Sequence, residues 1–119
     1  MEANAIVEKS FKYALRIVKL YQFLCEQRKE FVISKQLLRS GTAVGALVRE
    51  AEQAESRADF IHKMAIALKE ANESEYWLEL LHQSKYLDDT SYNSIAVDTK
   101  SLLKILTSII KSAKVSARK

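Results

Sequence analysis

The sequence contains no proline and only two glycines among its 119 residues. These two residue types usually end strands and form tight hairpin turns, so an all-β fold has few places to reverse the chain. Helices are therefore favoured before any periodicity is considered. Long uninterrupted apolar runs are also missing, and no stretch approaches the length of a membrane-spanning helix. We expect no association with a membrane.

Cysteine is almost absent as well. The single Cys25 cannot form an internal disulfide, which is compatible with a reducing compartment. Residues 1–5 lead into an amphipathic pattern with lysines, unlike the apolar core of a secretion signal. We therefore expect a cytoplasmic protein. With 48% apolar residues and both charge signs well represented, the composition fits one globular domain that spans residues 1–119.

Apolar residues recur in steps of three and four, which is the spacing of a helix with one buried stripe. The pattern predicts four helices, at about 5–26, 35–55, 57–87 and 91–114. The predicted buried stripe of the first helix is Val7, Phe11, Ala14, Val18, Tyr21 and Cys25. The stripe of the second helix is Leu37, Gly41, Val44, Val48 and Ala51. The stripe of the fourth is Tyr92, Ile95, Thr99, Leu102, Leu106, Ile109 and Ala113.

Short polar residues mark the predicted helix starts. Ser34 and Ser56 are the expected N-caps of the second and third helices, and Thr90 or Ser91 that of the fourth. Four helices of similar length joined by short connections must run antiparallel to their neighbours. The expected fold is an all-α, antiparallel up-and-down four-helix bundle. Steps averaging about 3.5 residues predict left-handed packing with helix crossings near about 20°.

Gly41 and Gly45 form the most unusual local composition, because each glycine inside a helix costs about 1 kcal/mol relative to alanine. A phosphate-binding loop is disfavoured, since the run lacks the P-loop lysine and lies within a helical pattern. Glycines one turn apart on a buried stripe let a neighbouring backbone approach closely. We predict that these two glycines mediate close helix packing.

No catalytic or metal-binding constellation stands out. Glu79 with His82 has the spacing used in di-iron bundles, and Asp59 with His62 gives a weaker version. About 30 Å of helix separates the two pairs, so they cannot share one metal centre within a subunit. Cys25 has no nearby base in the sequence. We expect no enzyme activity and no cofactor or metal.

Two glutamates interrupt the apolar stripe of the third helix. Glu75 and Glu79 would be costly to bury without a partner. A cation from an earlier helix, such as Arg16 or Arg39, is the favoured partner, and a role in ligand binding is the alternative. The sequence does not choose between the cations.

The third helix is apolar on nearly every side around its tryptophan, which is more than one core can cover. Because the connections are short, no loop is available to shield this segment. We predict an interface between copies of the chain. Its predicted residues are Tyr76, Trp77, Leu80 and Leu81.

Charge is distributed unevenly along the chain, whose formal net charge is +4. Residues 90–119 carry six lysines and arginines against one aspartate, whereas residues 56–89 carry four against seven acidic groups. A solvated face that complements a helix dipole explains this as well as nucleic-acid binding does. In the second interpretation the phosphate contacts are Lys100, Lys104, Lys111, Lys114, Arg118 and Lys119.

Several separated runs resemble one family. They are Gln36–Thr42, Val44–Ala46, Arg49–Ala51, Ala58–Ile61, Ala67–Ala71 and Tyr76–Leu78. Together they are similar to the bacterial four-helix-bundle proteins encoded in intervening sequences of 23S ribosomal RNA genes. The resemblance covers almost the whole chain. Ala43 and Leu47 depart from it, because members tend to carry serine and asparagine there.

The resemblance implies an up-and-down bundle and no reaction. Through the related accessory variability proteins of diversity-generating retroelements, it also implies a homopentameric barrel with a positively charged surface. Nucleic-acid binding or a reverse-transcriptase partner is suggested for those relatives alone. Our first hypothesis is a non-enzymatic oligomer that binds RNA or DNA through phosphate contacts. The alternative is a protein-interaction scaffold whose basic residues serve solubility.

Overall fold

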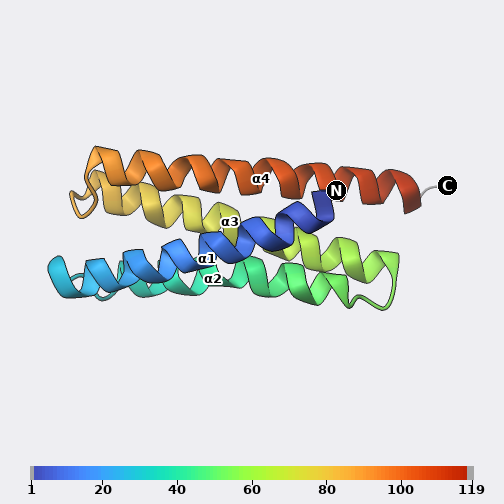
Figure 1. Ribbon diagram of the computed structural model, residues 1–119, viewed down its shortest axis with the longest axis horizontal. Helices are drawn as coiled ribbons and strands as arrows, with labels where there is room; N and C mark the ends of the chain where they lie inside the picture. Colours follow the sequence, from blue (N-terminus) through green and yellow to red (C-terminus); the bar gives the residue numbers. More distant parts are fainter. Residues whose placement is uncertain (1, 118–119) are drawn as a thin grey trace.

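The computed structural model describes residues 2–117, with side chains for residues 5–116. These residues form four α-helices: α1 (Glu2–Gln27), α2 (Ile33–Glu52), α3 (Arg57–Gln83) and α4 (Asp89–Ala117). The helices run up and down along a rod of 51 × 21 × 19 Å (Figure 1). Around the rod, α1 and α3 each pack against α2 and α4, so α1 and α3 lie diagonally across the bundle. The predicted all-α antiparallel four-helix bundle is confirmed.

A carboxylate caps the start of α2 in place of the predicted Ser34. The Glu30 side chain accepts the backbone N–H groups of Val32, Ile33 and Ser34 at 3.1, 3.0 and 2.6 Å. Burial alone would raise the pKa of Glu30, but these hydrogen bonds outweigh it and hold the pKa below its usual value. The buried charge therefore replaces the serine hydroxyl as the partner of the free N–H groups.

The N-cap prediction is confirmed for α3 and wrong for α4. At α3 the Ser56 hydroxyl accepts the backbone N–H of Asp59 at 3.0 Å. At α4 the Asp88 carboxylate accepts the backbone N–H of Ser91 at 2.7 Å, so neither Thr90 nor Ser91 is the cap. This hydrogen bond holds the pKa of Asp88 below its usual value. Both misplaced starts arise because an acidic residue upstream of the predicted serine or threonine supplies the cap.

The first helix is rotated relative to its prediction. Its side chains in the core are Ile6, Ser10, Tyr13, Ile17 and Leu24. The predicted stripe lies roughly 100°, one residue, further around the helix. Consequently Phe11 is 49% and Val18 37% exposed, and this part of the prediction is wrong. The sequence of α1 carries two apolar stripes, and spacing alone does not tell which one faces the core.

Two glycines of α2 set the position of α1. A Cβ atom at Gly41 would lie 2.7 Å from Cγ1 of Ile17, and one at Gly45 would lie 3.3 Å from the backbone oxygen of Ser10. The first distance is shorter than carbon atoms tolerate. Both glycines therefore lie at the contact between α1 and α2, as the close-packing prediction requires. Because they have no side chains, α1 can pack closely against α2.

A Gly41→Ala substitution tests this contact. Alanine is favoured over glycine in a helix by about 1 kcal/mol. The new methyl group would displace Ile17, however, and overpacking a core costs about 1–3 kcal/mol. We expect a net decrease of about 1 kcal/mol in the free energy of unfolding, measured in urea. Ala46 is exposed on the same helix, so Ala46→Gly measures the preference for alanine over glycine without a change in packing. A Gly41→Ala protein that is more stable than the wild type would contradict the close contact.

A buried polar layer joins all four helices near the middle of the rod. The Tyr13 hydroxyl of α1 lies 2.8 Å from the Thr99 hydroxyl of α4, and Thr99 donates to a carbonyl within α4. The Ser40 hydroxyl of α2 lies 2.9 Å from that of Ser74 on α3, which also interacts with Tyr13. All four residues are at most 2% exposed. Because buried hydroxyls need partners, this layer fixes how the helices are aligned along the rod.

Titration of Tyr13 provides a second test. Burial raises its pKa to about 12 from an ordinary value of 10. The folded chain therefore retains a proton that the unfolded chain loses, and stability falls as the pH rises from about 10 to about 12. Two units correspond to about 3 kcal/mol. Urea unfolding across this pH range should show this extra loss of unfolding free energy in the wild type. Tyr13→Phe keeps the other titrating groups and should not show it. Equal losses in the two proteins would contradict the burial of Tyr13.

Candidate nucleic-acid interface

The predicted lysines of α4 form an exposed row. Lys100, Lys104, Lys111 and Lys114 are all exposed, and their spacing places them on the outward side of the helix. The acidic residues of α4, Asp89 and Asp98, both precede this row. None of the four lysines forms an ion pair with a described residue. The other two predicted contacts, Arg118 and Lys119, lie outside the described residues.

Although α3 is acidic overall, several of its charged residues form ion pairs on the side that faces α2. Glu70 and Glu73 point toward α2, where Arg39 pairs with both, at 3.2 Å in the case of Glu70. A cation of α3, Lys63, also points toward α2, where it pairs with Glu50 at 3.0 Å. Glu70 and Glu73 are therefore neutralised on the side of α3 that faces α2.

The outward side of α3 contributes a further cation, Lys69. His82 of α3 stacks on Tyr92 of α4 with ring centroids 4.1 Å apart, which sets the antiparallel alignment of the two helices. In that alignment Lys69 lies at about the height of Lys104. Lys69 is exposed and forms no ion pair with a described residue. Sequence reasoning missed it because the count of charges along α3 hid how they divide around the helix.

We call Lys69, Lys100, Lys104, Lys111 and Lys114 the basic face. A shallow hollow of about 500 Å³ lies on it, between Lys104 and Lys111. Hydroxyl side chains of Thr107, Ser108 and Ser112 line the same hollow. Lysine and hydroxyl side chains are among the groups that contact the phosphate oxygens of nucleic acids. The face thus has the chemistry of a phosphate-binding surface.

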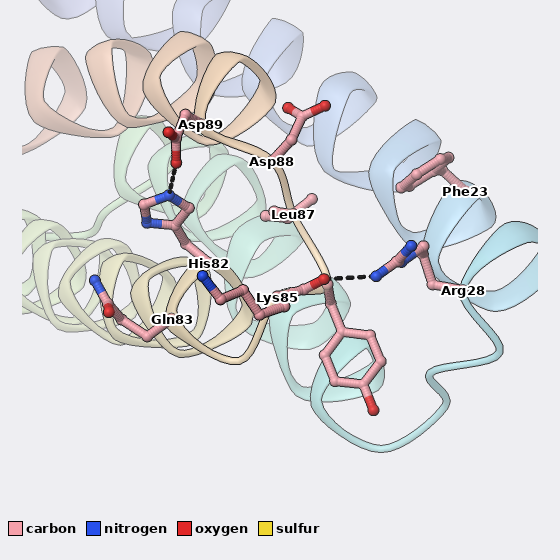
Figure 2. Close-up of a pocket in the computed structure, with 9 residues that line it drawn as sticks. Phe23, Arg28, His82, Gln83, Lys85, Leu87, Asp88 and Asp89 are labelled. Atoms are coloured by element: carbon pink, nitrogen blue, oxygen red, sulfur yellow. Dashed lines mark hydrogen bonds and ion pairs between the residues drawn. The ribbon is translucent and has the colours of Figure 1, made fainter.

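A second hollow, of about 590 Å³, lies at the end of the bundle where the α3–α4 connection meets the end of α1 (Figure 2). Its charges are of both signs, and several of its polar groups bind one another, although the buried Nδ1 of His82 has no hydrogen-bond partner among the described residues. Arg28 donates to the backbone oxygen of Lys85, and His82 Nε2 lies 2.7 Å from Asp89. These internal contacts leave the hollow without a group of one charge to attract a ligand.

Among the described residues, neither Glu75 nor Glu79 forms the predicted ion pair with Arg16 or Arg39. Arg16 donates to Asp98 of α4 at 2.6 Å, and Arg39 pairs with Glu70 and Glu73. Glu79 is exposed, so it needs no buried partner, and that part of the prediction is wrong. The error follows from assigning Glu79 to the buried stripe of α3, whereas it lies toward the solvent.

The predicted interface of α3 is buried to different degrees. Tyr76 is 58% exposed, and Trp77 and Leu80 are half-buried. Leu81 is fully buried in the core of its own chain, so its assignment to an interface is wrong. The Trp77 indole N–H donates to Glu73 at 2.9 Å, and the Tyr76 ring meets the indole edge to face at 4.9 Å. This surface is a rigid aromatic pair.

Within residues 2–117, no three histidine, cysteine, aspartate or glutamate side chains gather closely enough to hold a metal ion. No helix in this range is both long and apolar enough to cross a membrane. His62 is exposed, and the Cys25 sulfur lies 3.9 Å from the Ser34 hydroxyl.

The fold and the basic face define a small helical-bundle protein with a row of exposed lysines on α4. A profile of the 23S rRNA-intervening sequence protein family matches residues 2–108. The chain belongs to this family, which confirms the resemblance seen in the motifs. A search among curated proteins found no match.

A solved structure has the same architecture. It is a protein of unknown function from the S23 ribosomal protein family of Bacteroides thetaiotaomicron VPI-5482. It is 58% identical to this chain, and the alignment covers 93% of this chain and 99% of that one with a TM-score of 0.92. The family and the bundle are thus shared over nearly the full length.

Proposed function

We propose that this chain is a non-enzymatic, cytoplasmic protein that binds RNA or DNA through its basic face and associates with copies of itself. The observation that carries the proposal is the α4 row, in which four exposed lysines follow one another without an intervening acidic residue. Phosphate backbones attract such rows regardless of base sequence. Binding is therefore expected to be strong at low salt and insensitive to sequence.

The helix dipole does not account for the whole row. Its effect falls off within the last turn of a helix, where Lys114 lies. Lys100 and Lys104 lie near the middle of α4, more than two turns from its end at Ala117. Phosphate binding would account for positive charge at these positions as well.

Self-association would multiply this face. The homopentamer implied by the family resemblance would carry five copies of the basic face, which raises the number of phosphates that one nucleic acid can contact. Linked sites bind more tightly than single sites because the second contact is intramolecular. The assembly thus converts a modest charge per chain into an extended positive surface.

Charge reversal of the row tests the proposal. In Lys104→Glu/Lys111→Glu, two phosphate contacts per chain are lost and replaced by repulsion. We expect at least about tenfold weaker binding of a fluorescein-labelled RNA hairpin at low salt, and a log–log salt slope reduced by about 2 per chain. Fluorescence anisotropy between 50 and 200 mM KCl measures both, at about the salt range over which such contacts weaken.

The matched control is Lys9→Glu/Lys35→Glu. Both lysines are exposed, form no ion pair with a described residue and belong to α1 and α2, outside the five residues of the basic face. This variant has the same net charge as the test variant and should bind nearly as wild type does. Equal losses in the two variants would show attraction by net charge alone, and binding that ignores salt would contradict phosphate contacts.

A further inference from the structure

The outward side of α1 carries an apolar surface that the bundle does not cover. We call Phe11, Leu15 and Val18 the outer stripe, because helical spacing puts them on one side of α1. They are 49%, 50% and 37% exposed. Single exposed apolar residues are common on soluble proteins, whereas a contiguous row of large ones marks a contact surface.

The outer stripe has a basic border. The Arg49 guanidinium of α2 lies over the Phe11 ring at 5.1 Å, and Lys19 directly follows Val18 on α1. Lys19 is exposed and forms no ion pair with a described residue. A partner for the stripe must therefore be apolar at its centre and acidic, or at least not basic, at its edge.

The aromatic pair on α3 has these properties. Tyr76 is exposed, and Trp77 is held in place through Glu73, so ordering the pair on contact costs little entropy. The neighbouring Glu79 is exposed and forms no ion pair with a described residue. The nearest unpaired cation on α3, Lys69, lies about two turns from Tyr76. Aromatic anchors of this kind dominate the binding energy of protein interfaces.

We propose that the outer stripe of α1 packs on the Tyr76–Trp77 pair of a second copy of this chain. The inference rests on the self-association in the proposed function and names the two surfaces that make it. Because α1 and α3 lie diagonally across the bundle, a chain cannot join its own two surfaces. The contact is thus head to tail, and repetition of it builds a closed ring or a filament.

Charge disfavours the simpler arrangement in which the stripe packs on its own copy. A two-fold contact about Leu15 would bring the Arg49 and Lys19 borders of both chains toward each other, and like charges across an interface are unfavourable. The head-to-tail contact would instead place these cations near Glu79 of the second copy, which is exposed and forms no ion pair with a described residue. The two arrangements predict different behaviour of single-surface variants.

Two variants, each of which disables one surface, provide the test. Leu15→Glu places an acidic group against the acidic edge of α3, and Tyr76→Lys places a cation against the basic edge of the stripe. We expect native mass spectrometry without nucleic acid to show a multi-chain wild type and monomers of each variant. An equimolar mixture of the variants should associate again, because each supplies the surface that the other lacks.

The control is Val97→Glu, since Val97 is 67% exposed on α4, outside both surfaces, and this variant should assemble as wild type does. Circular dichroism and urea unfolding verify that each variant folds, and Phe11→Glu replaces Leu15→Glu if the latter does not. A monomeric wild type overturns both the inference and the proposed self-association. A multi-chain Leu15→Glu or Tyr76→Lys protein, or a mixture that stays monomeric, overturns the inference alone and leaves nucleic-acid binding to its own test.

Discussion

The rotation of α1 about its own axis is the constraint on which the rest of the structure depends. Gly41 and Gly45 leave space for Ile17 and for the backbone at Ser10. The face of α1 that carries these two residues therefore packs against α2. The same rotation brings the Tyr13 hydroxyl to α4, where it completes the polar layer. A turn of α1 by one residue would bury the other apolar stripe and leave that hydroxyl without its partner, at the cost of an unsatisfied buried group.

This rotation divides the surface between two roles. With Tyr13 inside, Phe11 and Leu15 are necessarily outside, so the α1 side of the bundle is left apolar. On α4 the lysine row is exposed, and on α3 Arg39 pairs with Glu70 and Glu73 on the side toward α2, which leaves Lys69 as an exposed cation without an ion pair to a described residue. One surface therefore suits a second copy of the chain, and the other suits a phosphate backbone. Packing inside the bundle determines where each surface lies.

The sequence predicts the features that depend on spacing along one helix. The stripes of α2 and α4 were correct because each of these helices has a single apolar side, as Val44, Val48 and Leu102 illustrate. The stripe of α1 failed because two sides are apolar, and only the glycines of α2 decide between them. Likewise, the row on α4 followed from its spacing, whereas the contribution of Lys69 depends on how α3 and α4 align. The spacing of apolar residues along one helix does not predict how that helix aligns with its neighbour.

Side-chain NMR of the isotope-labelled wild-type chain tests the rotation of α1 most directly. Nuclear Overhauser effects report which protons lie within a few ångströms, so they distinguish the two faces of α1 without any substitution. The account predicts contacts between the Tyr13 ring and the Thr99 methyl group, and between the Phe11 ring and the Arg49 side chain. Contacts from the Phe11 ring to the buried Leu102, together with a solvent-exposed Tyr13, would contradict it.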